Sequence, residues 1–164
     1  MEVLLINPDD LTKNTIILGN VDIDKLVPAM RSAQKTMIKP ILTSELYNKL
    51  CLDFYNDELS GDYLTLWTDY IKDMLIYSSA EIYINSGAYT ISNNGITKMA
   101  GEGAVTINKD ELSNQVEFYR RLYTIVKDDM FKWLKTTNLM NVENRQEYIR
   151  VGGILLKKPN VCQK

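Results

Sequence analysis

The sequence predicts a mainly α-helical protein: a helical bundle with two long amphipathic helices, an inserted β-hairpin arm, short N-terminal strands and an extended C-terminal tail. Two observations predict the long helices, because apolar residues recur at helical spacing over residues 62–85 and again over residues 110–134. A third observation predicts the arm. The stretch between the two helices, Ser86 to Lys109, is polar and interrupted by glycines.

The composition is that of an ordinary globular protein, with 164 residues of which 45% are hydrophobic and 24% charged. We expect one domain over residues 1–164, with a helical core over 24–137, the arm over 86–109 and the tail over 138–164. The 19 basic and 21 acidic side chains give a formal net charge of −2, so tight binding to nucleic acid is not expected. We also expect no signal peptide and no membrane span, because the N-terminus lacks a basic leader and no apolar run approaches about 18 residues.

Two short runs near the N-terminus predict strands. Val3 to Ile6 is apolar and is followed by the turn-forming residues Asn-Pro-Asp-Asp, and Thr15 to Leu18 is β-branched and ends at Gly-Asn.

The first helices follow from residue 24. Asp24 is a candidate N-cap for an amphipathic helix whose inward residues are Leu26, Met30, Ala33 and Met37. Pro40 should end this helix, and Thr43 or Ser44 can cap the next one. The inward face expected for the second helix comprises Leu46, Tyr47, Leu50, Cys51 and Phe54.

The two long helices carry the strongest periodicity. The first should run from Asp62 to Asn85, with an aromatic stripe at Tyr63, Trp67, Tyr70, Tyr77 and Tyr83 that we interpret as helix packing and not as a base-stacking platform. The second should begin near Asp110 and shows a near-heptad apolar stripe. Its members are Leu112, Val116, Tyr119, Leu122, Tyr123, Val126, Met130, Trp133 and Leu134. The basic residues of this helix read as a solvated face.

The arm has a hairpin signature. Tyr89 to Ser92 and Ile96 to Met99 alternate in polarity around Asn93-Asn94-Gly95, which favours a tight turn. Because a lone hairpin is marginal in water, we expect the arm to pack against a neighbouring copy of the chain. A further strand is expected at Val105–Ile107 and a short helix at Val142–Arg150. The arm residues expected to interact are Tyr89, Ile91, Asn94, Gly95, Ile96, Lys98 and Met99.

The residue types argue against catalysis. Without histidine there is no imidazole for acid/base work, nucleophile activation or metal binding. Carboxylates occur in pairs at Asp9/Asp10, Asp22/Asp24, Asp57/Glu58 and Asp128/Asp129, and we interpret them as turn formers, helix caps and a solvated helix face. We therefore expect no catalytic, cofactor-binding or metal-ligating residue.

Several of these segments together carry a family resemblance. They are Ala33-Gln34-Lys35, Ile38-Lys39-Pro40-Ile41-Leu42, Leu46-Tyr47-Asn48-Lys49-Leu50, the two long helices and the inserted Asn-Gly turn. Over roughly Asp24 to Thr137 the chain resembles the head-to-tail connector proteins of tailed bacteriophages, also called head completion, adaptor or ring proteins. The likeness is greatest to those of phages that infect Bacteroidetes, including crAss-like phages.

The resemblance implies a structural virion protein without enzymatic activity. Such subunits form a ring, typically of twelve copies, between the portal protein and the tail, and duplex DNA only passes through the channel. They assemble in the host cytoplasm and bind no membrane. The resemblance also implies that the arm, Tyr89–Ile107, and the C-terminal segment, Val151–Lys164, reach neighbours, the portal or other connector or tail proteins. The tail residues concerned are Ile154, Leu155, Leu156, Lys157 and Lys158.

Two other readings stay open. Asp24 to Phe54 could form a helix-turn-helix of a small DNA-binding or regulatory module, although its second helix offers only Lys49 as a base. The aspartate pairs could instead serve a carboxylate-dependent metal enzyme.

Overall fold

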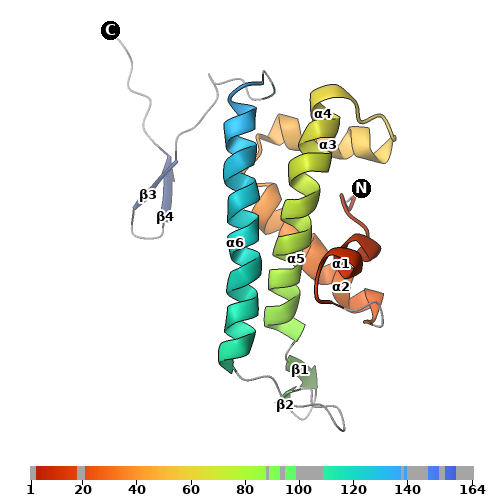
Figure 1. Cartoon of the computed structure of the whole chain (residues 1–164), viewed down its shortest axis with the longest axis vertical. Coiled ribbons are helices and arrows are strands. Elements are labelled where there is room, and N and C mark those ends of the chain that lie inside the picture. The colour runs from red at the N-terminus through yellow and green to blue at the C-terminus, as the bar shows by residue number, and fades with distance from the viewer. Residues whose placement is uncertain are drawn as a thin grey trace.

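The computed structural model describes residues 3–17, 21–87, 89–92, 95–98, 109–137, 139, 148–151 and 154–157 (Figure 1). The helices are α1 (Pro8–Asn14), α2 (Ile23–Ala33), α3 (Ser44–Tyr55), α4 (Gly61–Thr65), α5 (Lys72–Gly87) and α6 (Lys109–Leu134), with π-helical segments η1 (Gln34–Ile38) and η2 (Leu66–Ile71). The strands are β1 (Tyr89–Ser92), β2 (Gly95–Lys98), β3 (Tyr148–Val151) and β4 (Ile154–Lys157). The predicted mainly α-helical architecture is confirmed.

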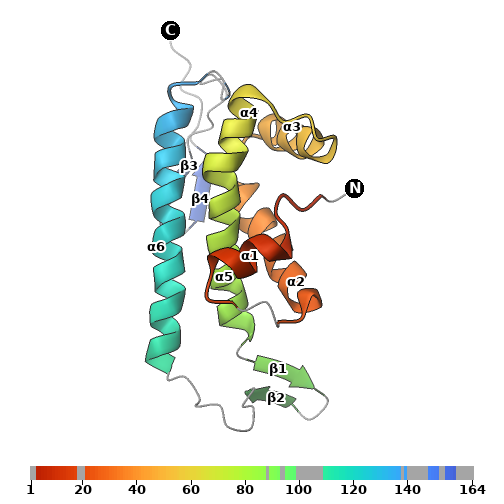
Figure 2. The same cartoon turned by 45° about the vertical axis from the view of Figure 1, so that its right-hand side comes forward.

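Two rods form the centre of the fold. α4, η2 and α5 follow one another without a break from Gly61 to Gly87, and α6 runs beside them in the opposite direction (Figures 1 and 2). At 1.5 Å per residue each rod is about 40 Å long. α2 packs against α5 as well, so that α5 lies between α6 and the N-terminal helices. The core that these helices enclose includes the fully buried Leu26, Met30, Leu50, Leu66, Ile71, Met74, Leu75 and Met130.

Three members of the aromatic stripe of the first rod pack against rings of other helices, as expected. The ring centroids of Trp67 and Phe54 of α3 are 5.3 Å apart. The corresponding distance is 5.3 Å between Tyr70 and Trp133 of α6, and 6.4 Å between Tyr77 and Tyr119 of α6. These separations are typical of aromatic pairs in protein cores.

The helix caps were partly foreseen. Thr43 caps α3, because its hydroxyl oxygen accepts a hydrogen bond from the Leu46 amide at 3.2 Å. The expected cap at Asp24 is wrong. Asp22 caps α2 instead, since its carboxylate accepts from the Asp24 amide at 3.1 Å, and Asp24 lies in the first turn.

Each π-helical segment contains one residue whose side chain hydrogen-bonds to the backbone of Leu5. In η1 the Lys39 amide donates to the Gln34 carbonyl at 3.0 Å, and in η2 the Lys72 amide donates to the Trp67 carbonyl. Each of these bonds encloses one residue more than an α-helical bond does. Gln34 and Trp67 are the two residues whose side chains bind Leu5.

The N-terminal strand expected over Val3–Ile6 is wrong. The Leu5 amide donates to Gln34 Oε1 at 2.9 Å, and the Leu5 carbonyl accepts from Trp67 Nε1 at 2.9 Å. The Val3 carbonyl accepts from Gln34 Nε2 at 2.7 Å. Because side chains satisfy these backbone groups, the segment needs no partner strand, although Leu5 and Ile6 are buried.

The second strand, expected over Thr15–Leu18, is also wrong for the residues described. Thr15 ends α1 and its hydroxyl donates to the Leu11 carbonyl at 2.7 Å, while the Ile16 amide donates to the Tyr119 hydroxyl at 2.9 Å. The bonds of this segment therefore go to α1 and α6 instead of to a strand. Leu18 lies outside the described residues.

The β-strands lie outside the helical bundle. β1 and β2 pair antiparallel, with Ile91 opposite Ile96 and Tyr89 opposite Lys98, and β3 and β4 pair in the same way. The helix expected over Val142–Arg150 is wrong at its end, because β3 begins at residue 148 and its backbone groups bond to β4. Residues 142–147 and the strand expected at Val105–Ile107 lie outside the described residues.

Replacing Gln34 tests how the N-terminal segment is held. Gln34→Leu keeps the size of the side chain but leaves the Leu5 amide and the Val3 carbonyl without their partner, so we expect a loss of about 2–3 kcal/mol in unfolding free energy. Thr36→Val, at an exposed position of the same segment, should change it by less than about 0.5 kcal/mol. Urea denaturation measures both. Equal midpoints for the two variants would show that Gln34 does not hold the segment.

Candidate functional site

The predicted arm lies at one end of the bundle. Figures 1 and 2 place β1 and β2 beyond the end of α5, where the chain passes from one rod to the other. Of the arm residues expected to interact, Asn94 and Met99 lie outside the described residues, and the others lie on β1 and β2. In the tail, residues 154–157 form β4 and Lys158 lies outside the described residues. The interaction roles of both segments stay predictions.

The long helix α6 has an exposed apolar stripe that the sequence analysis missed. Phe118 and Ile125 are 51% and 52% exposed. They are seven residues apart, and therefore share one face of the helix. Neither residue belongs to the inward stripe that the sequence predicts for this helix. A large apolar residue outside that stripe is the sequence signal for an exposed apolar position. Isolated apolar residues on a surface are common, but a pair on one helix face is a candidate for contact with another protein.

A buried carboxylate joins the two rods. Glu81 of α5 is 5% exposed, and its Oε1 accepts hydrogen bonds from Arg120 Nε and Nη2 of α6 at 3.0 Å and 2.8 Å. The bond and the charge of Glu81 raise the pKa of the Arg120 guanidinium. Glu81 Oε2 has no hydrogen-bond partner among the described residues. Arg120 therefore neutralises a carboxylate that is otherwise out of contact with water.

Tyr123 provides a second link from α6. Its hydroxyl donates to the Met37 carbonyl of η1 at 3.1 Å. That carbonyl lies where the helix is interrupted, because Pro40 has no amide and the Ile41 amide donates to Ile38. Burial and the charge of Glu81 raise the pKa of Tyr123 from 10.0 to about 12.

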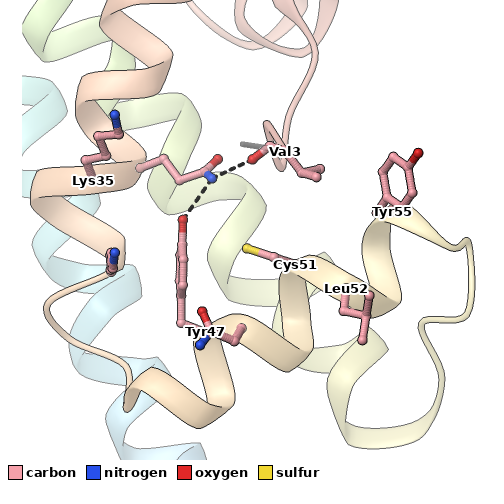
Figure 3. A pocket seen from close by; sticks show the side chains of 9 residues that line it. Val3, Lys35, Tyr47, Cys51, Leu52 and Tyr55 are labelled. Atoms are coloured by element: carbon pink, nitrogen blue, oxygen red, sulfur yellow. Dashed lines mark hydrogen bonds between the residues drawn. The ribbon is translucent and has the colours of Figure 1, made fainter. Parts of the chain in front are cut away.

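A pocket of about 750 Å³ opens between η1 and α3 (Figure 3). Tyr47, Asn48, Cys51, Leu52 and Tyr55 line it from the α3 side. From the other side it is lined by Val3, Gln34, Lys35 and Lys39. Gln34 Nε2 donates to the Tyr47 hydroxyl at 3.0 Å, which fixes the Tyr47 side chain at the inner wall.

Cys51, expected as a small core residue, is only partly buried, and its sulfur lies in this pocket. Burial raises the pKa of the Cys51 thiol, against the hydrogen bond with Tyr47 and the charge of Lys39. The thiol is therefore protonated at neutral pH and is not an activated nucleophile.

In at least three of the four carboxylate pairs one residue has a structural partner. Asp10 accepts from the Asn7 amide and lies 2.8 Å from Lys72 Nζ, Asp22 caps α2, and Asp129 lies 2.7 Å from Lys132 Nζ. Lys49 is the basic residue of the possible DNA-recognition helix, and its Nζ lies 2.8 Å from Oδ2 of Asp53 in the same helix. Within the described part of the chain, no group of three or more His, Cys, Asp or Glu residues is placed to hold a metal ion. The described helices also include none that is long and apolar enough to cross a membrane.

The fold is that of an elongated, mainly α-helical protein in which strands β1 and β2 follow the first rod in the sequence and lie beyond the end of α5. The chain belongs to the DUF6712 family, a family of unknown function, and the match covers residues 38–148. This region runs from the end of η1 through α3, both rods and the arm to the start of β3. No curated protein and no solved structure matches the chain.

Replacing Arg120 tests the link between the rods. Arg120→Ala leaves the Glu81 carboxylate buried without its cation, so we expect a loss of about 1–3 kcal/mol in unfolding free energy. Arg121→Ala, at the next and exposed position, is the matched control and should cost less than about 0.5 kcal/mol. Thermal and urea unfolding measure the difference. If the two variants lose equal stability, Glu81 does not depend on Arg120.

Replacing Tyr123 gives a pH-dependent result. Tyr123→Phe loses the bond to Met37, so we expect about 1 kcal/mol less stability near pH 7. Because the pKa of Tyr123 is raised in the folded protein, its stabilising contribution is complete below pH 10.0 and declines as pH rises toward about 12. The stability difference between the unmodified protein and the variant should therefore shrink over this range. A constant difference would contradict the assignment, and exposed Tyr55→Phe is the control.

Proposed function

We propose that the protein is a structural subunit of the head-to-tail connector of a tailed bacteriophage. In this proposal, copies of the chain form a ring, typically of twelve, between the portal protein and the tail. The subunit extends the DNA channel, binds the portal protein and other connector or tail proteins, and makes or breaks no covalent bond.

The exposed stripe of α6 carries the proposal. Phe118 and Ile125 leave two large apolar side chains exposed about 10 Å apart on one face of α6, and association with another protein would remove them from water. A contact between unlike faces of identical subunits closes into a ring when the rotation between neighbours divides a full turn. The same packing would cover the exposed edges of the arm, because unpaired strand edges favour aggregation in a free monomer.

The charge balance also supports a channel role. DNA that slides through a ring should not be held by it, and each basic contact to phosphate adds affinity. The chain carries a formal net charge of −2, and Arg120 and Lys132, two of the basic residues of α6, are paired with acidic side chains. The ring would therefore oppose the passage of duplex DNA very little.

Charges placed in the apolar stripe test the proposal. We expect Phe118→Glu/Ile125→Glu to abolish incorporation of the subunit into phage particles, because two carboxylates would be buried at the interface between copies. The fold should remain intact, since both positions are exposed. Complementation of a deletion strain and quantitation of the protein in purified particles measure incorporation, and circular dichroism checks the fold.

Thr124→Glu is the matched control, because it adds a carboxylate to an exposed position on another face of α6 and should leave incorporation unchanged. Cryo-electron microscopy of native particles should place the protein in a symmetric collar between portal and tail. Full incorporation of the double variant would exclude this face of α6 as the interface. Particles that contain no copy of the chain would refute the connector function itself.

A further inference from the structure

The ribbon formed by β3 and β4 has one face that consists only of aliphatic residues. Ile149 is paired with Leu156, and Val151 with Ile154. Directly paired residues share a face of a ribbon, and alternate residues of a strand do so too, so these four positions belong to one face. The other face is formed by Tyr148, Arg150, Leu155 and Lys157. Because a two-stranded ribbon is at most marginally stable alone in water, the aliphatic face requires a partner surface.

The exposed apolar pair on α6 matches this face in size. Phe118 and Ile125 lie about 10 Å apart along the helix, and a strand of four residues is about 13 Å long. One ribbon can therefore cover both side chains. Leu52 and Tyr55, the exposed apolar pair on α3, are only three residues apart and span about 5 Å along their helix, which is too short to use the whole face.

The chain's own ribbon does not cover the α6 pair. About half of the surface of Phe118 and of Ile125 stays exposed in the single chain, although β3 and β4 belong to the same structure. Among the described elements, β3 and β4 pack chiefly against each other. The ribbon that covers the α6 pair should therefore come from another copy of the chain.

The chain between α6 and β3 is long enough for this exchange. Residues 135–147, thirteen in all, separate Leu134 from Tyr148 in the sequence. Thirteen residues span at most about 43 Å, and a helix with its side chains is about 10–12 Å wide. The ribbon can therefore reach α6 of an adjacent copy.

Charge should contribute little to this contact. The basic residues of the ribbon, Arg150 and Lys157, belong to its other face, and α6 carries charges of both signs next to the apolar pair, such as Glu117, Arg121 and Asp128. Arg121 lies on the same helix face as the pair, and its aliphatic stem can pack against the ribbon while its guanidinium stays in water. Apolar burial is therefore the term that would hold the two surfaces together.

We propose that the aliphatic face of the β3–β4 ribbon of one copy packs on Phe118 and Ile125 of α6 in the next copy. The inference rests on the proposed function in one respect, the association of copies through α6, and it names the surface that α6 meets. Because each copy provides one ribbon and receives another, the contact joins unlike surfaces and can continue from copy to copy around a ring.

Paired cysteines test the contact in a Cys51→Ala/Cys162→Ser background. Ile125→Cys combined with Ile154→Cys should give disulfide-linked dimers and longer chains after oxidation with copper–phenanthroline, as measured on non-reducing gels. The assay uses the purified protein at millimolar concentration and phage particles from a complemented deletion strain. A mixture of the two single-cysteine variants, one of them enlarged by a tag, should give a linked dimer of intermediate mass, which a contact within one chain cannot produce.

Two control pairs move one cysteine by a single position. Ile125→Cys with Leu155→Cys uses the other face of the ribbon, and Thr124→Cys with Ile154→Cys uses another face of α6, so each should give at least about fivefold less linked product. Ile149→Ser, added to the Ile125→Cys/Ile154→Cys protein, should also lower the yield about fivefold, because it removes apolar area from the contact. About 0.5 M salt should leave the yield within about twofold, since salt screens charges and not apolar contacts.

A disulfide confined to single chains would place the ribbon on its own α6 and would overturn the inference. Equal yields in the control pairs would do the same, and so would the absence of linked product from both the purified protein and the particles. Particles that contain the subunit in normal amount without any linked product would leave the connector function standing. Conversely, linked chains in the purified protein, together with particles that contain no copy, would support the contact and refute the connector function.

Discussion

The structure depends on the hydrogen bonds that the buried backbone groups of Leu5 form with side chains of distant helices. Leu5 is fully buried, and its amide and carbonyl groups meet the side chains of Gln34 and Trp67. An unpaired buried polar group costs free energy comparable to a lost hydrogen bond, so the N-terminal segment, η1 and η2 must keep their relative positions. Gln34 also bonds to Tyr47, which extends the same constraint to α3 and the pocket. One carboxamide thus fixes the arrangement of the N-terminal segment, α2 and α3.

Helical periodicity predicted the long helices correctly. Short sequence patterns gave wrong predictions for segments whose structure depends on contacts with residues far away in the sequence. Both rods were located from the spacing of their apolar residues, because a helix of this length must bury one continuous face. The four residues Val3–Ile6 resemble a strand, but a strand requires a neighbour for its backbone, and side chains from distant helices supply the bonds instead. The cap of α2 was displaced by two residues because Asp22 and Asp24 are equally suitable N-cap residues, and only the backbone geometry selects between them.

The candidate surfaces were harder to predict than the fold. Phe118 and Ile125 fall outside the inward stripe that the sequence predicts, but single exposed apolar residues are common on protein surfaces, so the sequence alone does not mark them as a contact surface. Glu81 looks like a solvated helix residue, and its burial against Arg120 arises from a contact across 39 positions of the sequence. The pocket is equally non-local, because η1, α3 and the N-terminal segment each contribute to it. The aromatic residues were interpreted correctly, since large rings spaced along one helix face usually pack between helices.

The π-helical segments have a consequence for how such chains can vary in length. Each contains one residue more than an α-helical turn requires. η2 continues directly into helices on both sides, α4 and α5, whereas η1 follows α2 and ends at the turn that precedes α3. A deletion at such a site can be absorbed by a return to α-helical bonding, whereas a deletion in the middle of α6 would rotate its buried face by about 100°. Gaps between homologous sequences should therefore concentrate near Gln34–Ile38 and Leu66–Ile71, and a homologue that has lost the extra residue would need another way to bind the backbone of its N-terminal segment.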